Sequence, residues 1–169
     1  RMGPCQEIQA LQRYLESTSY PPSVDDAAIV ALAAANGMVL TVAQLHSAGL
    51  TRANIEARRG KLLVPVVRGV YAVGPVTPGV RLRAVLAVLG NGAASHRTAA
   101  RLHGLALPAV AVVEVTVSRR TTVEVAGVRI RWTRWLPDED VTTVGGIRAT
   151  SLARTVCDLA GALPSDRKS

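Results

Sequence analysis

The chain has 169 residues, of which 49% are hydrophobic, and its twenty Lys and Arg outnumber twelve Asp and Glu to give a formal net charge of +8. This length suits one ordinary domain or two small ones, and the apolar content is enough for a packed core, which excludes an intrinsically disordered chain. The basic excess makes nucleic acid the first partner to consider, whereas the longest apolar runs are too short to cross a bilayer.

Aromatic residues make up only 3% of the chain, and phenylalanine is absent. Single-stranded nucleic acid is held largely by stacking of bases on aromatic rings, so double-stranded DNA is the better candidate. The two cysteines, Cys5 and Cys157, lie far apart and lack the spacing of metal ligands. They indicate a reduced, cytoplasmic protein.

Residues 1–23 form the first predicted segment. Apolar residues at helical spacing predict a short helix over residues 6–16, and the run STSYPPS that follows it predicts a linker.

Residues 24–74 follow the order of a winged helix: a helix, a brief strand, two short helices joined by a turn, and a hairpin. Each boundary has a local signal, which is an acidic first turn, a threonine cap or a glycine. The predicted elements are a helix at 25–36, a strand at 38–41, two helices capped by Thr41 and Thr51 that end at Gly49 and Gly60, and a hairpin that turns at Arg68-Gly69. We therefore predict an amino-terminal winged helix-turn-helix that binds DNA.

The second short helix carries the candidate reading face. Arg52, Glu56 and Arg59 fall at i, i+4 and i+7 on one side of it, while Ile55 and Leu62 should face inward. The hairpin turn is basic as well, which is expected of a wing that contacts DNA. Taken alone, the helix face has an equally good alternative, a solvated surface with one ion pair. The candidate DNA-binding residues are Thr51, Arg52, Asn54, Arg58, Arg59, Lys61 and Arg68.

A second unit is predicted over residues 77–163, with residues 164–169 as a tail. The predicted elements are a helix from Pro78, a helix from Ser95, strands in VVEVTVS, TTVEVA and VRIRWTRW, a hairpin over Gly145-Gly146, and a last helix capped by Thr150. The second and third strands should be joined at Gly127. This half is predicted to be a small α+β domain with an antiparallel sheet, which makes the whole chain α+β.

Three polar groups of the second unit could bind a metal or take part in catalysis, but each also has a structural explanation. His96 and His103 share a helix face but lack a third ligand with metal spacing, so structural roles are favoured. Ser95 precedes His96, but adjacent helical side chains point about 100° apart, so a capping serine is the better account than a nucleophile. The cluster at residues 138–140, Asp-Glu-Asp, either holds Mg²⁺ or starts a helix in a solvated loop, and the second is favoured. We predict a protein that is not an enzyme and has no metal or cofactor.

A second basic set follows the first predicted strand of this unit. Arg119 and Arg120 lie at a strand end, and Arg129 and Arg131 share one face of a later strand by the period of two. This set is the candidate partner-binding surface, for phosphate or for an acidic toxin. Alternatively, these arginines only form the solvent-exposed face of an antiparallel sheet and bind no partner.

Four runs, RGVYAVG, SHRTAARLHGL, VEVTV and LPDEDVTTVGGIRATSLARTVCDLA, occur in an order that resembles the AbiEi-type antitoxins of bacterial type IV toxin-antitoxin systems. They are equally similar to the amino-terminal regions of actinobacterial proteins that carry a very-short-patch-repair-like endonuclease domain. The likeness covers residues 25–163. It implies a winged-helix domain that represses its own operon, and a second domain linked to neutralising a nucleotidyltransferase-like toxin.

The leading hypothesis is therefore a DNA-binding transcriptional regulator of the antitoxin type, with operator or promoter DNA and a nucleotidyltransferase-like toxin as its partners. The alternative is the DNA-targeting portion of a nuclease-associated protein whose catalytic domain is absent from this chain. A third hypothesis is a protein-interaction module whose charge keeps it in solution.

Overall fold

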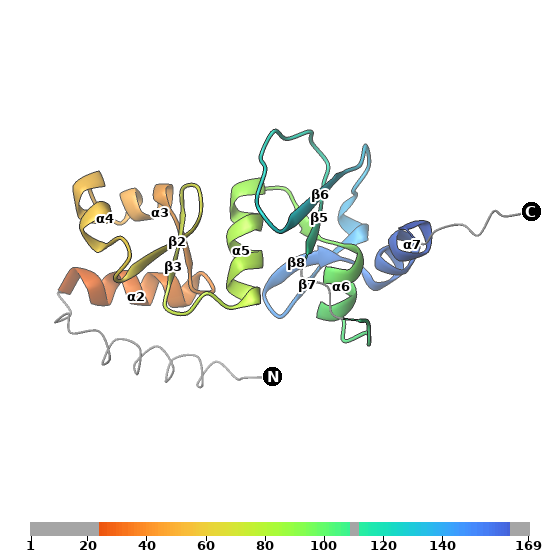
Figure 1. Ribbon diagram of the computed structural model, residues 1–169, viewed down its shortest axis with the longest axis horizontal. Helices are drawn as coiled ribbons and strands as arrows, with labels where there is room; N and C mark the ends of the chain where they lie inside the picture. The colour runs from red at the N-terminus through yellow and green to blue at the C-terminus, as the bar shows by residue number, and fades with distance from the viewer. Residues whose placement is uncertain (1–23, 109–111, 163–169) are drawn as a thin grey trace, which may run out of the picture. The chain divides into compact units, whose positions relative to one another are not determined.

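The computed structural model describes residues 24–108 and 112–162 of the chain (Figure 1). Within that part the fold is α+β, and the chain divides between Val88 and Leu89 into two compact units. None of the described helices is long and apolar enough to span a membrane. The helix predicted at residues 6–16, together with Cys5 and the tail at 164–169, lies outside the described residues.

The first unit contains every element predicted for residues 24–74. These are α2 (Val24–Ala35), β1 (Val39–Thr41), α3 (Val42–Ser47), α4 (Arg52–Arg58), β2 (Leu63–Val67) and β3 (Val70–Val73), and the unit continues with α5 (Pro78–Leu89). The strands form an antiparallel sheet in the order β1-β3-β2, so the hairpin strand β3 is central.

The local signals work as the sequence indicated. Thr41 and Gln44 form a capping box, in which the Thr41 hydroxyl accepts from the Gln44 amide and the Gln44 side chain accepts from the Thr41 amide. The Thr51 hydroxyl caps α4 by accepting from the Asn54 amide at 3.2 Å. Gly69 turns the hairpin with φ of +77°, a backbone angle at which a Cβ atom would be strained.

The sheet of the first unit is covered on both faces. One cluster joins α2, α3 and α4 to the sheet through buried residues such as Ile29, Leu45 and Ile55. On the other face, α5 contributes Val80 and Ala84 to a cluster with residues of β1 and β3. The helix from Pro78 was predicted to belong to the second unit, but its apolar side covers the sheet of the first, so the division falls at the end of this helix.

The second unit is built on a five-stranded sheet in the order β6-β5-β4-β8-β7. Its elements are β4 (Ala93–Ala94), α6 (His96–Leu102), β5 (Val113–Val117), β6 (Val128–Trp132), the 3-10 helix η1 (Asp138–Asp140), β7 (Val141–Val144), β8 (Ile147–Thr150) and α7 (Leu152–Ala162). The predicted hairpin over Gly145-Gly146 joins β7 to β8 and is confirmed.

The strand pairing of this sheet differs from the prediction. The sheet is mixed, because β5 pairs with β6 and β4 pairs with β8 in parallel. Residues 121–126, predicted as a strand, instead belong to the loop that crosses from the end of β5 back to the start of β6. Parallel neighbours require such a crossover, so a segment of strand-forming composition serves as the connection. In Figure 1 this loop arcs away from the sheet between β5 and β6.

The last helix also begins differently from the prediction. Ser151, and not Thr150, accepts the amide of Arg154 through its hydroxyl, at 3.3 Å. The Thr150 hydroxyl is buried and bonds the hydroxyl of Thr155 at 2.7 Å. The capping residue was therefore predicted one position too early. Both positions carry a hydroxyl, but that of Thr150 is buried against Thr155, so the Ser151 hydroxyl accepts from the first turn of the helix.

Candidate nucleic-acid interface

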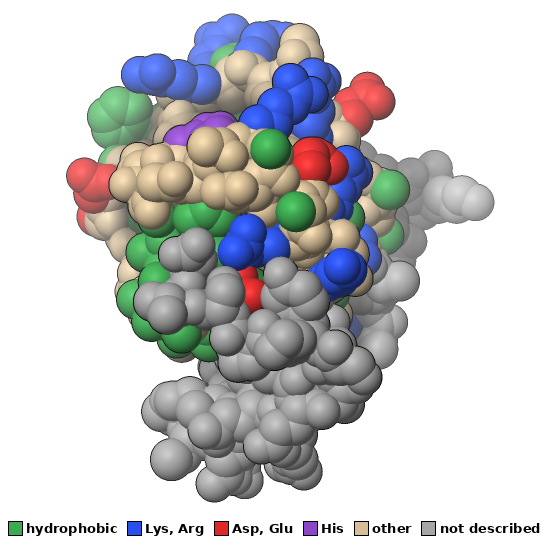
Figure 2. Space-filling model, turned by 90° about the vertical axis from the view of Figure 1, so that its left-hand side faces the viewer, with side chains coloured by type: hydrophobic (Ala, Val, Ile, Leu, Met, Phe, Trp, Pro, Cys, Tyr) green, Lys and Arg blue, Asp and Glu red, His purple; other side chains and the backbone are tan. Residues whose placement is uncertain are grey.

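A groove of about 700 Å³ lies between α4 and the β2-β3 hairpin, and three of the predicted DNA-binding residues line it. Arg52 reaches it from the start of α4, Arg59 from the residue that follows the helix, and Arg68 from the hairpin turn. Ile55 and Tyr71 form part of its apolar floor. Toward the top of Figure 2, which looks from the side of α3 and α4, Lys and Arg side chains gather near a histidine. The groove therefore joins the helix and the hairpin turn into one basic surface.

The expected helical face is present on α4. Arg52, Glu56 and Arg59 all line the groove, as their spacing predicted, and Ile55 and Leu62 are buried. Glu56 and Arg59 form an ion pair at 3.4 Å, with side chains 51% and 53% exposed. So exposed a pair contributes little stability, and Arg59 can exchange its carboxylate partner for a phosphate at small cost.

Arg58 has a different role from the one that the sequence suggested. Its guanidinium donates from Nε to a carboxylate oxygen of Asp26 in α2, and the two side chains are only 12% and 4% exposed. Its Nη1 also donates to the carbonyl of Asn54 at 3.2 Å. Arg58 therefore ties α4 to α2 and does not face the groove. Asp26 precedes it by 32 residues, so no local spacing could have indicated the pair.

The remaining predicted residues lie outside the groove. Thr51 and Asn54 are exposed at the start of α4, where the Thr51 hydroxyl serves as the cap, and Lys61 is exposed in the turn before β2. Asn54 follows Arg52 by two positions, so its side chain points about 200° away around the helix. Arg52 and Asn54 therefore do not share a reading face.

His46 lines the groove and was not among the predicted residues. It lies in the last turn of α3, and its ring Nδ1 contacts the carbonyl oxygen of Leu50 at 2.8 Å. A carbonyl can only accept, so Nδ1 donates there and the ring orientation is fixed. The available signal was its position just before Gly49, at the turn that joins the two short helices.

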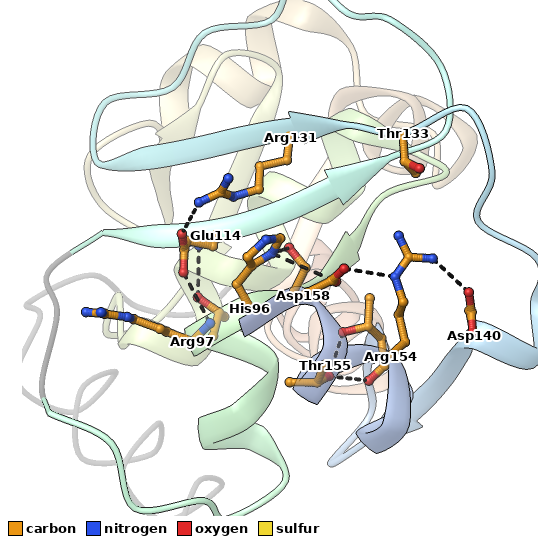
Figure 3. A network of polar contacts seen from close by, with 12 residues as sticks. His96, Arg97, Glu114, Arg131, Thr133, Asp140, Arg154, Thr155 and Asp158 are labelled. Carbon is orange, nitrogen blue, oxygen red and sulfur yellow. Dashed lines mark hydrogen bonds and ion pairs between the residues drawn. The ribbon is translucent and has the colours of Figure 1, made fainter. Parts of the chain in front are cut away.

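In the second unit, the buried carboxylate of Glu114 is the centre of an ion-pair network (Figure 3). Its carboxylate accepts from Arg131 Nη2 at 3.1 Å and from the Arg97 amide at 3.1 Å, and Arg129 lies 3.6 Å away. Burial alone would raise the pKa of Glu114, but the hydrogen bonds from Arg131 and from the Arg97 amide outweigh it and lower that pKa. Arg129 and Arg131 do share one face, as predicted, but they are the counterions of a carboxylate of the same chain.

Ser95 and His96 meet, contrary to the expectation from helical geometry. The Ser95 hydroxyl lies 3.1 Å from Nδ1 of His96, and it makes no cap hydrogen bond. The reason is that His96 has φ of +50°, outside the helical range on which the expectation relied. Asp158 lies 3.9 Å from the same Nδ1.

This arrangement differs from that of a Ser-His-Asp triad. A general base uses one ring nitrogen for the nucleophile and the other for the orienting carboxylate, whereas here both neighbours face Nδ1. Ser95 is also fully buried. Burial, followed by the positive charge of Arg131, lowers the pKa of His96, so the ring is neutral at pH 7. His103 is satisfied separately, with Nε2 at 2.8 Å from the carbonyl oxygen of Thr150.

The acidic cluster at residues 138–140 starts the 3-10 helix η1, as favoured from the sequence. Asp140 accepts from Arg154 Nη1 at 2.7 Å, and Arg154 Nε donates to Asp158 at 2.9 Å. These two carboxylates raise the pKa of Arg154. Within residues 24–108 and 112–162, no group of three or more His, Cys, Asp or Glu side chains is arranged to hold a metal ion.

Arg119 and Arg120 are exposed at the end of β5, as the partner-binding prediction requires. The guanidinium of Arg120 stacks over the ring of Trp132, 4.4 Å from its centre.

No model of a known protein family matches the chain, and no curated protein matches it.

Proposed function

We propose that the protein is a DNA-binding transcriptional regulator, and that residues 24–74 act as a winged helix. The observation that carries the proposal is the single groove that Arg52 and Arg59, at the two ends of α4, share with Arg68 of the hairpin turn. In this arrangement α4 enters the major groove of duplex DNA, which is wide enough for one helix. Arg68 then lies against the neighbouring sugar-phosphate backbone.

We further propose that the regulator is an antitoxin of the AbiEi type, which represses its own operon and neutralises a nucleotidyltransferase-like toxin. The resemblance in the order of short runs supports this role. The second unit then binds a partner and performs no catalysis, and the burial of Ser95, His96 and Glu114 supports that part of the proposal. Co-expression with a nucleotidyltransferase-like toxin from the same organism should restore the growth of cells that the toxin arrests, whereas a toxin that stays active would leave DNA binding as the only role.

Fluorescence anisotropy with duplex DNA from the protein's own promoter tests the first part. Two phosphate contacts, from Arg59 and Arg68, predict a slope of log K against log salt of about −2, since each contact contributes about −0.9. A scrambled duplex should bind more weakly with a similar slope. Absence of binding at low salt, or binding that salt does not weaken, would overturn the proposal.

Two variants separate base reading from charge. Arg52→Ala should cost about 1 to 3 kcal/mol on the promoter duplex and much less on the scrambled one. Asn54→Ala is the matched control, because Asn54 is also exposed on the same helix but lies outside the groove. Arg68→Ala should weaken binding to both duplexes alike and reduce the slope by about 1. Equal losses for the Arg52 and Asn54 variants would refute the orientation of α4.

A further inference from the structure

Strand β6 has a free edge. In the described part of the chain it pairs only with β5, at the end of the five-stranded sheet. The Thr133 amide donates to the Val117 carbonyl, and the Val113 amide donates to the Gly127 carbonyl. In a parallel ladder alternate residues bond to the neighbour, so the odd-numbered positions of β6 face β5. The amides and carbonyls of Ile130 and Trp132 therefore point outward, available to another strand.

A groove of about 1020 Å³ lies beside this edge. Val128, Ile130 and Trp132 line it from β6, and residues 120–126 of the crossover loop line its other side. Trp132 is 42% exposed. A row of apolar side chains thus borders outward-facing backbone groups, a combination that binds extended peptides in other proteins by strand addition.

The opposite face of β6 is basic. Arg129 and Arg131 alternate with the apolar residues, and the Arg129 side chain is 60% exposed even while it pairs with Glu114. Two guanidinium groups share that one carboxylate, so this face keeps net positive charge. Arg119 and Arg120 add positive charge at the end of β5, against the single carboxylate of Glu124 in the loop.

The crossover loop shows which sequence suits this edge. Within the segment TTVEVA at 121–126, Val123 and Val125 flank the acidic Glu124, and the turn at Gly127 would allow this segment to pair with β6 as a hairpin. It lines the far side of the groove and leaves the edge open. A second copy of the chain fits poorly, because antiparallel pairing of β6 with itself would bring like-charged arginines face to face.

We propose that β6 binds an extended segment of a partner protein in which apolar and acidic residues alternate. The segment adds as a sixth strand, with its apolar side chains beside Ile130 and Trp132 in the groove and its acidic side chains beside Arg129 and Arg131. Its main chain bonds the outward groups of Ile130 and Trp132. None of these residues belongs to the first unit, so this binding neither requires DNA binding nor fails with it.

A ten-residue peptide of alternating valine and glutamate tests the proposal on the full chain. The protein has two tryptophans, so a Trp135→Phe background leaves Trp132 as the only reporter. Binding should bury Trp132 and shift its emission to the blue, and calorimetry should give a matching affinity. A peptide of the same composition in two blocks and an alternating valine-lysine peptide should both bind at least tenfold more weakly.

Ile130→Pro tests strand addition itself. It removes one outward amide but keeps the ladder to β5, and proline is tolerated on the outer side of an edge strand. The change should weaken peptide binding about tenfold, because one peptide carbonyl loses its donor. Ile130→Val is the matched control and should bind as the parent does, and thermal melting checks that both variants are folded. Equal binding of the block peptide, an unaffected proline variant, or quenching of Trp132 only by single-stranded oligonucleotides would each overturn the proposal.

Discussion

The ion pair between Arg58 and Asp26 implies that Arg58 of α4 stabilises the fold and does not contact DNA. If Arg58 faced DNA, as its place in a basic helix suggests, Arg58→Ala would weaken binding and leave folding intact. The structure predicts the reverse, because the guanidinium meets the carboxylate of Asp26 in α2, 32 residues earlier in the chain. The variant should unfold more easily and bind DNA normally while it is folded.

The magnitude follows from burial. Removing one partner of a buried ion pair typically costs about 3 to 5 kcal/mol, because the remaining charge stays out of water. Arg58 is 12% exposed, so some hydration reaches the site, and we expect about 2 to 4 kcal/mol. In a unit of this size each kcal/mol lowers the melting temperature by roughly 4 to 8 °C, which makes the loss at least about 8 °C. Arg59→Ala, which breaks an exposed pair on the same helix, should change stability by less than about 0.5 kcal/mol.

Urea unfolding followed by circular dichroism gives both free energies, and anisotropy well below the melting temperature gives the affinities. A double-mutant cycle with Asp26→Ala should show a coupling energy of at least about 1 kcal/mol. The reasoning is refuted if Arg58→Ala keeps the parent's urea midpoint and binds promoter DNA more weakly. In that case the residue would be a DNA contact and the ion pair of no consequence.

Three further predictions concern single sites. The free energy of unfolding should fall as the pH drops below about 6.5, because His96 takes up a proton in the unfolded chain, whereas its lowered pKa keeps it neutral in the folded state. His96→Gln should reduce this dependence, measured as urea midpoints between pH 7 and pH 5. Arg131→Met should cost about 1 to 3 kcal/mol at pH 7, because Glu114 stays buried with one fewer hydrogen bond, and the difference from the parent should shrink below about pH 4.5 as Glu114 takes up a proton. Gly69→Ala should cost about 1 kcal/mol in the same assay, since the residue has φ of +77° and its Cβ would meet no other atom.

Signals that act within one turn of chain were readable from the sequence. Thr41 and Thr51 cap the helices that they were expected to cap, and Gly69 turns the hairpin where it was expected to turn. Each depends on a hydrogen bond or a backbone angle among residues no more than three positions apart. The helical face of Arg52, Glu56 and Arg59 was readable for the same reason, because spacing alone decides it.

Pairings between distant residues were not readable. The partner of Glu114 is 17 residues away on a strand whose parallel direction depends on how the crossover runs. The segment at 121–126 has the composition of a strand, and only the direction of β6 makes it a connection. The backbone of His96 is a smaller case of the same kind, since its positive φ arises where the chain leaves β4 and enters α6.

These pairings change what the net charge of the chain means for DNA binding. Arg58, Arg131 and Arg154 each meet a carboxylate that is at most 30% exposed, and transferring any of them to a phosphate would leave that carboxylate uncompensated. Arg52 and Arg68 have no ion-pair partner among the described residues, and Arg59 has an exposed one that is easily exchanged. The affinity for duplex DNA should therefore follow the number of exposed groove arginines, and it should depend on salt far less steeply than a formal charge of +8 would suggest.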